Sequence, residues 1–227
     1  MPGSWSKGSP LALPIVTSPL SAAGEIAIRS LIERAPLASS LAAAYKSAGF
    51  KLALVGGPVR DAILGRLGND LDFTTDALPL ESKKILKIWG ESIWDTGIEF
   101  GTVAAKRGDT TVEVTTYRSD RYDPESRKPE VVFGDNIAGD LSRRDFTVNC
   151  MALELTTATP EFIDPFNGLA DLAKQILRTP VTPEQSFSDD PLRMMRAARF
   201  ASQLNFEIEE QTLLAMKDMA SRISIVS

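Results

Sequence analysis

The hydrophobic pattern after Lys51 changes abruptly from strand spacing to helix spacing. Apolar residues run without a break from Leu52 to Val55, which predicts a buried strand. Gly56 and Gly57 end that run, and apolar residues then recur on one side of a helical pattern over 59–67. The stretch therefore predicts a strand that enters a helix through two glycines.

A second strand is predicted at 70–76, where charged and apolar residues alternate. Asp70 and Asp72 are interleaved with Leu71 and Phe73. Alternate residues of a strand point to the same face, so both carboxylates lie on one face while the apolar pair enters the core. Two like charges side by side repel each other unless a cation lies between them. A hard divalent ion with oxygen ligands fits this need, and Mg²⁺ is the usual one where triphosphates are handled.

Helices and strands alternate through the rest of the first 180 residues. The predicted elements are a helix over 25–47, a helix over 79–90, a hairpin of 97–105 with 111–117, a mobile polar loop over 118–136, a helix or tight turn at 140–149, and a strand, turn and short helix over 162–172. Proline breaks helices, so Pro36 is expected to split the first of them.

From about residue 180 onward the pattern is helical only. One helix is predicted over 189–200, with an aspartate cap and a proline in its first turn, and a last helix over 208–225. That last helix stops in the middle of its pattern, which indicates a truncated chain. Residues 1–24 are rich in Ser, Pro, Gly and Ala and predict a flexible leader. The expected division is thus a leader, a unit over 25–180 and a helical unit over 181–227.

Composition narrows the chemistry further. The chain has 227 residues, 43% of them hydrophobic, which is enough for a substantial core, and its net charge of −5 excludes a uniformly basic nucleic-acid binder. It contains no histidine, which removes imidazole bases, Ser-His-Asp triads and His metal sites. Its single cysteine, Cys150, lies in an apolar run and predicts a small buried hydrophobe in a protein of the reducing cytoplasm. No stretch is long and apolar enough to span a membrane.

Three groups of residues are candidates for chemistry. A strand that enters a helix through Gly56 and Gly57 leaves backbone N–H groups at the positive end of the helix dipole, which suits a phosphate. On the strand 111–117, alternation places Glu113 on one face and Val112 and Val114 on the other. Glu113 can therefore join Asp70 and Asp72 as a third carboxylate if the two strands are neighbours.

The third group is rich in arginine. The interleaving of Arg144 and Asp145 with apolar residues fits either a capped helix with a surface ion pair or a ribose and phosphate grip, with Arg144 on triphosphate oxygens and Asp145 on sugar hydroxyls. Further along, residues three apart share a helix face, which groups Asp190, Arg193, Arg196 and Arg199. Such a stripe is often solvated surface, but the apolar residues between these arginines favour a site.

Together these motifs identify the chain as resembling the class II tRNA nucleotidyltransferases and bacterial poly(A) polymerases, within the polymerase β-like superfamily. The first motif of that family is similar to Leu54-Val55-Gly56-Gly57-Pro58-Val59-Arg60-Asp61 with Asp70-Leu71-Asp72, and its third acid falls at Glu113. The sugar-selecting motif resembles 143–149, the hinge-like motif 164–168 and the nucleotide-templating motif 189–200. The matches run in order from about residue 50 to the end of the chain.

The resemblance implies an α+β fold: a catalytic head with a small mixed sheet flanked by helices over 25–180, then an all-α neck over 181–227. Body and tail regions that hold tRNA in family members are absent. It implies addition of CCA from CTP and ATP to the tRNA 3′ end, with release of pyrophosphate and two Mg²⁺ held by Asp70 and Asp72. The nucleotide-binding residues that it implies are Gly56, Gly57, Arg60, Arg144, Asp145, Asn149, Asp190, Arg193, Arg196 and Arg199.

Three alternatives remain open at this stage. A poly(A) polymerase and an enzyme that adds only CC or only A share the same motifs. An inactive RNA-binding module on the same fold is the alternative without catalysis, although a binder gains nothing from clustered acids beside phosphate.

Overall fold

A seven-stranded sheet organises the computed structural model of the protein, which describes residues 25, 29, 36–121, 130–134 and 136–225. In spatial order the strands are β3 (Ser92–Trp94), β4 (Thr102–Arg107), β5 (Thr110–Thr116), β2 (Asp70–Thr75), β1 (Ala53–Val55), β8 (Ala152–Glu154) and β9 (Glu161–Ile163). β2 and β5 pair in parallel, whereas the other neighbours are antiparallel. The predicted mixed sheet is therefore confirmed.

The predicted elements around the two glycines are confirmed closely. β1 is fully buried, and it runs into the helix α3 (Gly57–Ile63) through Gly56. In β2 the side chains of Leu71 and Phe73 are buried in the main core, as the alternation predicts. The hairpin of β4 with β5 is also confirmed, although residues 98–100 form a short 3₁₀ turn before it.

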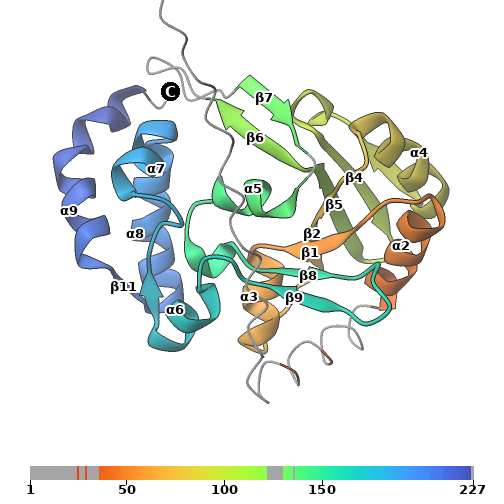
Figure 1. The fold of residues 1–227 in the computed structure, drawn as a ribbon, viewed down its shortest axis with the longest axis horizontal. Coiled ribbons are helices and arrows are strands. Elements are labelled where there is room, and N and C mark those ends of the chain that lie inside the picture. The colour runs from red at the N-terminus through yellow and green to blue at the C-terminus, as the bar shows by residue number, and fades with distance from the viewer. Residues whose placement is uncertain (1–24, 26–28, 30–35, 122–129, 135, 226–227) are drawn as a thin grey trace, which may run out of the picture.

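Helices cover the sheet at both ends (Figure 1). The helices α2 (Pro36–Ser47) and α4 (Pro79–Trp89) lie at one end, and α4 ends at Gly90 as expected. α2 begins at Pro36, and most of the predicted helix before it, residues 26–28 and 30–35, lies outside the described residues. The helix α5 (Ile137–Ser142) directly precedes the arginine motif at 143–149, and α6 (Gly168–Lys174) begins at the end of the hinge-like motif at 164–168.

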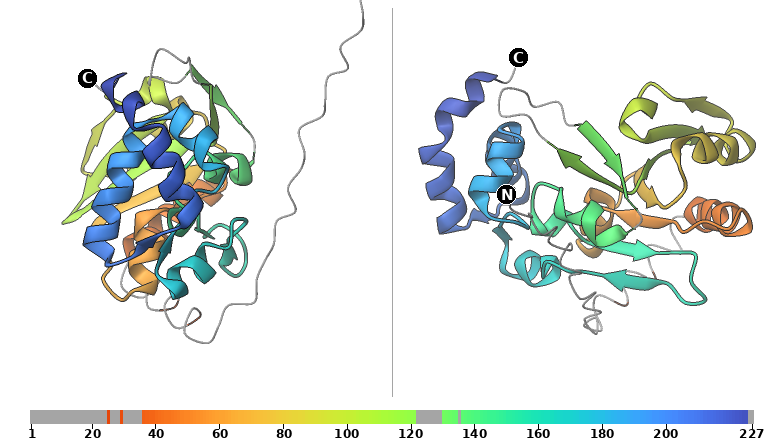
Figure 2. Two further views of the ribbon diagram at one scale, coloured as in Figure 1. Left: turned by 90° about the vertical axis from the view of Figure 1, so that its left-hand side faces the viewer. Right: turned by 45° about the horizontal axis from the view of Figure 1, so that its top comes forward.

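Three helices gather at the other end of the sheet, where Figure 2 shows them stacked side by side. They are α7 (Pro183–Asp189), α8 (Leu192–Leu204) and α9 (Glu210–Asp218). The purely helical pattern predicted here is wrong in one respect, because residues 207–208 form the strand β11 (Glu207–Ile208), which pairs in parallel with β10 (Ile176–Leu177). The single helix predicted over 208–225 is also wrong, since α9 gives way to 3₁₀ turns over 220–225.

The polar segment 118–136 differs from the predicted mobile loop. Its two ends form an antiparallel hairpin, β6 (Arg118–Arg121) with β7 (Glu130–Phe133). Only 122–129 and 135 within it fall outside the described residues. Backbone hydrogen bonding therefore pairs the two described ends of a stretch whose composition is that of a loop.

The helical end of the chain shares the main core with the sheet. Ala197, Phe200 and Phe206 belong to the same buried cluster as Leu54 and Phe73, while a second, smaller cluster of Phe187, Met194 and Ala215 packs α7, α8 and α9 together. The division near residue 180 stays a prediction, and the predicted leader at 1–24 lies outside the described residues. No helix in the described part of the chain is long and apolar enough to cross a membrane.

Candidate active site

Two acids from different strands lie side by side on the exposed face of the sheet. β2 exposes Asp70 and Asp72, and the parallel register places Asp72 directly opposite Glu113 of β5, which is exposed as well. Asp72 and Glu113 border the same recess of about 220 Å³. The sequence condition for Glu113 to join the aspartates, that the two strands are neighbours, is thus met.

The electrostatics of Asp72 reflect this crowding. Withdrawal of its carboxylate from water raises its pKa, the nearby Arg144 guanidinium acts in the opposite direction, and the charges of Glu113 and Asp70 raise the pKa further. The net direction is upward. A carboxylate whose charged form is destabilised in this way is stabilised most by a metal cation or an arginine beside it.

A cleft of about 440 Å³ adjoins the acids and brings most of the predicted nucleotide-binding residues together. Its lining consists of Gly56, Gly57, Arg60, Asp72, Arg118, Arg143, Arg144, Asp145, Asn149, Asp190, Arg193, Arg196 and Phe200. These residues come from the β1–α3 turn and α3, from β2 and β6, from the stretch after α5, and from the α7–α8 junction and α8, so the cleft spans the sheet and the helical end.

The glycine turn supplies space more than hydrogen-bond donors. Gly56 has φ +74°, a backbone conformation that side chains rarely adopt. A Cβ there would lie 2.9 Å from Nη1 of Arg144, so its absence lets the guanidinium approach the turn. The Gly56 N–H already donates to the carbonyl of Met151 at 3.2 Å. The N–H groups that were expected to be open at this turn therefore do not include that of Gly56.

A chain of polar contacts runs along the floor of the cleft. Arg60 is buried; its Nε and Nη2 donate to Asp61 at 2.9 and 2.8 Å, and its Nη1 donates to Oδ1 of Asn149 at 2.6 Å. The Asn149 amide donates to Oδ1 of Asp145 at 2.8 Å, and Arg196 Nε donates to Oδ2 of Asp145 at 2.8 Å. Asp145 thus pairs with Arg196 of α8 and Arg144 pairs with Asp140, so the surface ion pair considered from sequence is replaced by a network that crosses from α3 to α8.

The pair Asp190 and Arg193 lies where α7 meets α8. Oδ1 of Asp190 accepts a hydrogen bond from the N–H of Leu192 at 3.0 Å. The predicted aspartate cap is nevertheless wrong, because Pro191 occupies the N-cap position of α8 and Asp190 ends α7. Arg193 is buried and donates to Oγ of Ser186 at 2.9 Å and to the carbonyl of Arg143 at 2.6 Å. A guanidinium has five N–H donors, so these two bonds leave donors for a nucleobase.

Three predicted site residues lie outside the cleft lining: Glu113 borders only the adjoining recess, and Asp70 and Arg199 border neither. Asp70 shares the exposed face with Asp72 but does not border the cleft or the recess. Arg199 is exposed, with its guanidinium carbon 5.0 Å from the centre of the Phe200 ring.

Three residues of the cleft were not singled out from the sequence: Arg118, Arg143 and Phe200. Arg143 stands directly before Arg144, which was the available signal. Phe200 packs under Arg60 and Arg196, each 5.3 Å from its ring centre, and such aromatic support has no local sequence signature.

Cys150 is confirmed as a buried residue rather than a nucleophile. Its thiol is enclosed and lies 3.1 Å from the carbonyl of Phe146, to which it donates. Burial raises its pKa well above the ordinary value, so the reactive thiolate is disfavoured.

Comparison with known proteins places this site in a family. The family described as the poly A polymerase head domain matches residues 52–178, which is more than half of the chain. The chain belongs to the poly A polymerase head domain family. Its head-domain match covers the acids, the glycine turn and the arginine motif, and ends before α7 and α8.

Two relatives with similar sequences are both named CCA-adding enzyme. The chain is 45% identical over 174 residues to the CCA-adding enzyme of Lactobacillus helveticus, covering 76% of this chain and 42% of that protein. The corresponding enzyme of Enterococcus faecalis is 44% identical over 180 residues, with 79% and 43% covered. This head-domain chain therefore spans less than half the length of these relatives.

Solved structures agree with the sequence comparison. The Bacillus stearothermophilus CCA-adding enzyme in complex with CTP has a TM-score of 0.72 and 35% identity, covering 84% of this chain and 44% of that one. A tRNA nucleotidyltransferase complexed with a primer tRNA and an incoming ATP analog has a TM-score of 0.66 and 32% identity, with 80% and 50% covered. The mixed α+β head is thus shared with nucleotidyltransferases.

The acids of the head domain fit a magnesium site, although they do not form a closed cage. Nucleotidyltransferases of this family are generally metal-dependent. Within the described ranges, no group of three or more Asp, Glu, Cys or His side chains is arranged to hold a metal ion. Mg²⁺ is usually bound by one or two carboxylates together with substrate phosphates and water, so the oxygen donors of Asp72 and its neighbours suit it.

Proposed function

We propose that this chain is the nucleotide-binding and catalytic head of a template-independent RNA nucleotidyltransferase that adds C and A from CTP and ATP to the 3′ end of tRNA. The observation that carries the proposal is the placement of Asp72 beside Glu113 at the edge of an arginine-lined cleft. Acids next to several guanidinium groups suit a reaction in which a triphosphate is held and a hydroxyl attacks it.

In this proposal Asp70 and Asp72 hold two Mg²⁺ ions, with Glu113 as the third acid of the site. The bound ions supply a lowered pKa for the primer hydroxyl and neutralise charge on the triphosphate. The chain's own residues orient the reactants: Arg144 contacts phosphate oxygens, Asp145 and Asn149 face the sugar, and Gly56, Gly57 and Arg60 shape the phosphate pocket. Attack of the 3′-hydroxyl at the α-phosphorus then releases pyrophosphate.

The experiment that tests the function uses the 227-residue chain and four separate nucleotides. We expect incorporation of C into tRNA that ends before the first or the second C, and of A into tRNA that ends before A. Addition of A to every RNA indicates a poly(A) polymerase, and incorporation of one base alone indicates a CC-only or A-only enzyme. RNA and CTP binding without incorporation indicates the inactive module and contradicts the proposal.

The relatives are about twice as long as this chain, so its affinity for tRNA has to be tested separately from its catalytic turnover. The assay is therefore run over a wide range of tRNA concentration, so that a weak grip raises the KM for tRNA without abolishing turnover. We propose residues 181–227 as the neck that joins the head to the RNA-holding part of such an enzyme.

Base selection is proposed to come from Asp190 and Arg193. Cytosine and adenine both present an exocyclic amine beside a ring nitrogen acceptor, so a carboxylate acceptor next to a guanidinium donor fits either base. Uracil and guanine reverse this order and would leave buried groups unpaired, which costs about 1–3 kcal/mol per group.

Replacement of Arg193 by alanine should therefore reduce the preference for CTP and ATP over UTP. We expect a loss of about tenfold to a hundredfold in the ratio of kcat/KM values, from the cost of one unpaired group. The matched variant Arg193→Lys keeps the charge and loses the planar fork, so its preference should also fall. An unchanged preference in Arg193→Ala, with the melting temperature checked to show folding, contradicts this assignment.

A further inference from the structure

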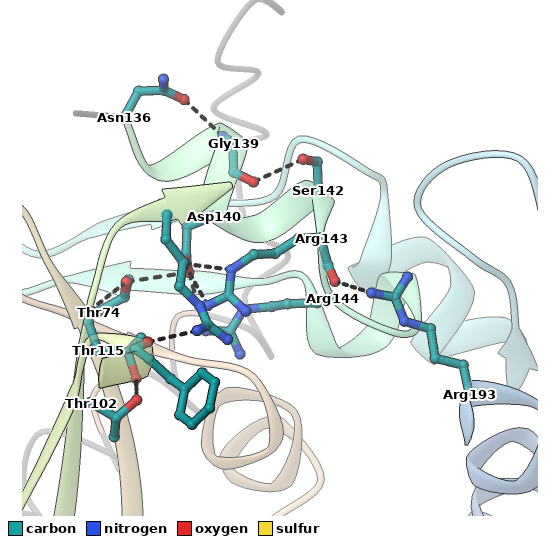
Figure 3. Close-up of polar contacts among 12 residues, drawn as sticks. Thr74, Thr102, Thr115, Asn136, Gly139, Asp140, Ser142, Arg143, Arg144 and Arg193 are labelled. Carbon is teal, nitrogen blue, oxygen red and sulfur yellow. Dashed lines mark hydrogen bonds and ion pairs between the residues drawn. The ribbon is translucent and has the colours of Figure 1, made fainter. Parts of the chain in front are cut away.

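Asp140 is a fully buried carboxylate that lies between the catalytic strand and the cleft arginines (Figure 3). Its Oδ1 accepts hydrogen bonds from Nε and Nη2 of Arg143 at 3.0 and 2.7 Å. Its Oδ2 accepts from Nη2 of Arg144 at 3.3 Å and from Oγ1 of Thr74 at 3.2 Å. Both oxygens are thus fully engaged, and two of the donors are residues that line the cleft.

Asp140 stays charged in this environment. Burial alone would raise its pKa, but Arg143 and Arg144 outweigh that effect and hold the pKa below its ordinary value. A buried carboxylate is tolerated only when it is paired and hydrogen-bonded, as here. The same contacts also fix the arginines, since a guanidinium bound to a rigid anion loses its rotational freedom.

The position of Asp140 connects three parts of the site. Thr74 follows Asp72 by two residues on β2, and its hydroxyl also lies 3.1 Å from the carbonyl of Thr115 on β5. On the other side, the carbonyl of Arg143 accepts a hydrogen bond from Arg193 of α8 at 2.6 Å. One carboxylate therefore ties the acid-bearing strands, the cleft arginines and the proposed base-selecting helix together, and Figure 3 shows this continuous path.

The need for such an anchor follows from what surrounds the arginines. Arg143 and Arg144 border both the cleft and the recess that contains Asp72 and Glu113. Arg144 already acts electrostatically on Asp72. Without Asp140, the guanidinium groups of Arg143 and Arg144 would turn toward Asp72 and Glu113, because these two carboxylates are the nearest anions of the recess. The arginines would then compete with the metal ions for the catalytic acids.

We propose that Asp140 is the positioning residue of this site: it directs Arg143 and Arg144 into the cleft and keeps them off the catalytic acids, without contacting the substrate itself. This inference rests on the proposed nucleotidyltransferase function. It assigns Asp140 an effect on kcat through Arg144, and little effect on the affinity for nucleotide, because the positive charge of the cleft is retained.

The test compares Asp140→Asn with the wild type in nucleotide incorporation and in CTP binding without RNA. We expect kcat to fall by about 30-fold, as for one misdirected electrostatic contact in the transition state, while the CTP dissociation constant stays within threefold or tightens. In a double-mutant cycle with Arg144→Gln, the double variant should be no slower than the worse single variant by more than about twofold, since both act through one group.

Asp171→Asn is the matched control. Asp171 is also a buried carboxylate that pairs with an arginine, Arg178 at 3.2 Å, and accepts from Thr147 at 2.8 Å, but it lies on α6 and does not border the cleft. The variant Asp171→Asn should have a lower melting temperature than the wild type and an unchanged kcat. If Asp140→Asn does not fold, Thr74→Val replaces it in the test, since it removes the contacts of the Thr74 hydroxyl with Asp140 and with the Thr115 carbonyl but keeps the ion pairs of Asp140. In that variant kcat should fall severalfold at unchanged affinity.

The outcomes separate this inference from the proposed function. A wild type that incorporates no nucleotide overturns both. A wild type that is active, with Asp140→Asn or its substitute Thr74→Val equally active, overturns only the role of Asp140. Parallel losses of kcat and CTP affinity, or additive effects with Arg144→Gln, also overturn it, because they indicate general damage to the fold.

Discussion

Replacement of Asp72 by asparagine should lower nucleotide incorporation by at least about a thousandfold, which is the effect expected when a metal-binding carboxylate of a phosphoryl-transfer site is neutralised. Asp72 is the one predicted acid that borders both the cleft and the recess beside it. Its amide replacement keeps the shape of the side chain and loses the charge. The rate is measured with radiolabelled CTP and tRNA lacking its terminal nucleotides.

Stability distinguishes this loss from unfolding. Glu113 and Asp70 both act to raise the pKa of Asp72, which means that they disfavour its charged form. Removal of that charge should therefore leave the melting temperature unchanged or higher, while CTP binding is retained. Glu161→Gln on the edge strand β9 is the control, because it neutralises an exposed carboxylate of the same sheet away from the cleft. More than a tenth of the wild-type rate in Asp72→Asn contradicts the assignment.

The largest effect on stability is expected from Gly168→Ala. A Cβ at Gly168 would lie 2.2 Å from the carbonyl oxygen of Thr147 and 2.9 Å from Cγ of Met151, so backbone must move. The Gly168 N–H also donates to Oδ1 of Asp164 at 2.7 Å, which fixes the start of α6. We expect a loss of about 3 kcal/mol or more, as for severe overpacking, or roughly 6–12 °C in melting temperature for a domain of this size.

Gly68→Ala serves as the comparison for this variant. A Cβ at Gly68 would meet no atom within 4 Å, and the residue does not adopt a positive φ. Its melting temperature should stay within about 2 °C of the wild type, since the added methyl group contacts nothing. Equal melting temperatures for Gly68→Ala and Gly168→Ala would show that α6 can shift without cost, and would contradict the prediction.

The sequence predicts those elements that bury one side of a regular pattern. β1, α3 and β2 are recognisable because Leu71 and Phe73 alternate with exposed acids and because Gly56 ends an apolar run. The hairpin β6–β7 is not recognisable, since Val132 and Phe133, the two apolar residues at the end of β7, remain 38% and 41% exposed. β11 is missed because two residues paired with a distant strand are too few to show a period.

The site shows a similar limit. The family resemblance groups Arg60, Asp145 and Arg193 in one site, but it does not show which of their atoms are already engaged in contacts within the protein. Whether the Gly56 N–H is available depends on a carbonyl almost a hundred positions later in the chain, that of Met151. The role of Asp140 depends on contacts with Thr74 on another strand. Such contacts follow from tertiary packing, and a pattern along one chain does not contain them.

The short parallel pair β10–β11 has a mechanical consequence. The N–H groups of Glu207 and Glu209 donate to the carbonyls of Gln175 and Leu177, at 2.9 and 3.0 Å. Phe200 of α8 is buried in the same core as the sheet. The pairing of β10 with β11 and the burial of Phe200 attach α8 to the rest of the structure at its C-terminal end and along its length. We therefore expect Arg193 and Arg196 to keep their places in the cleft unless these contacts break.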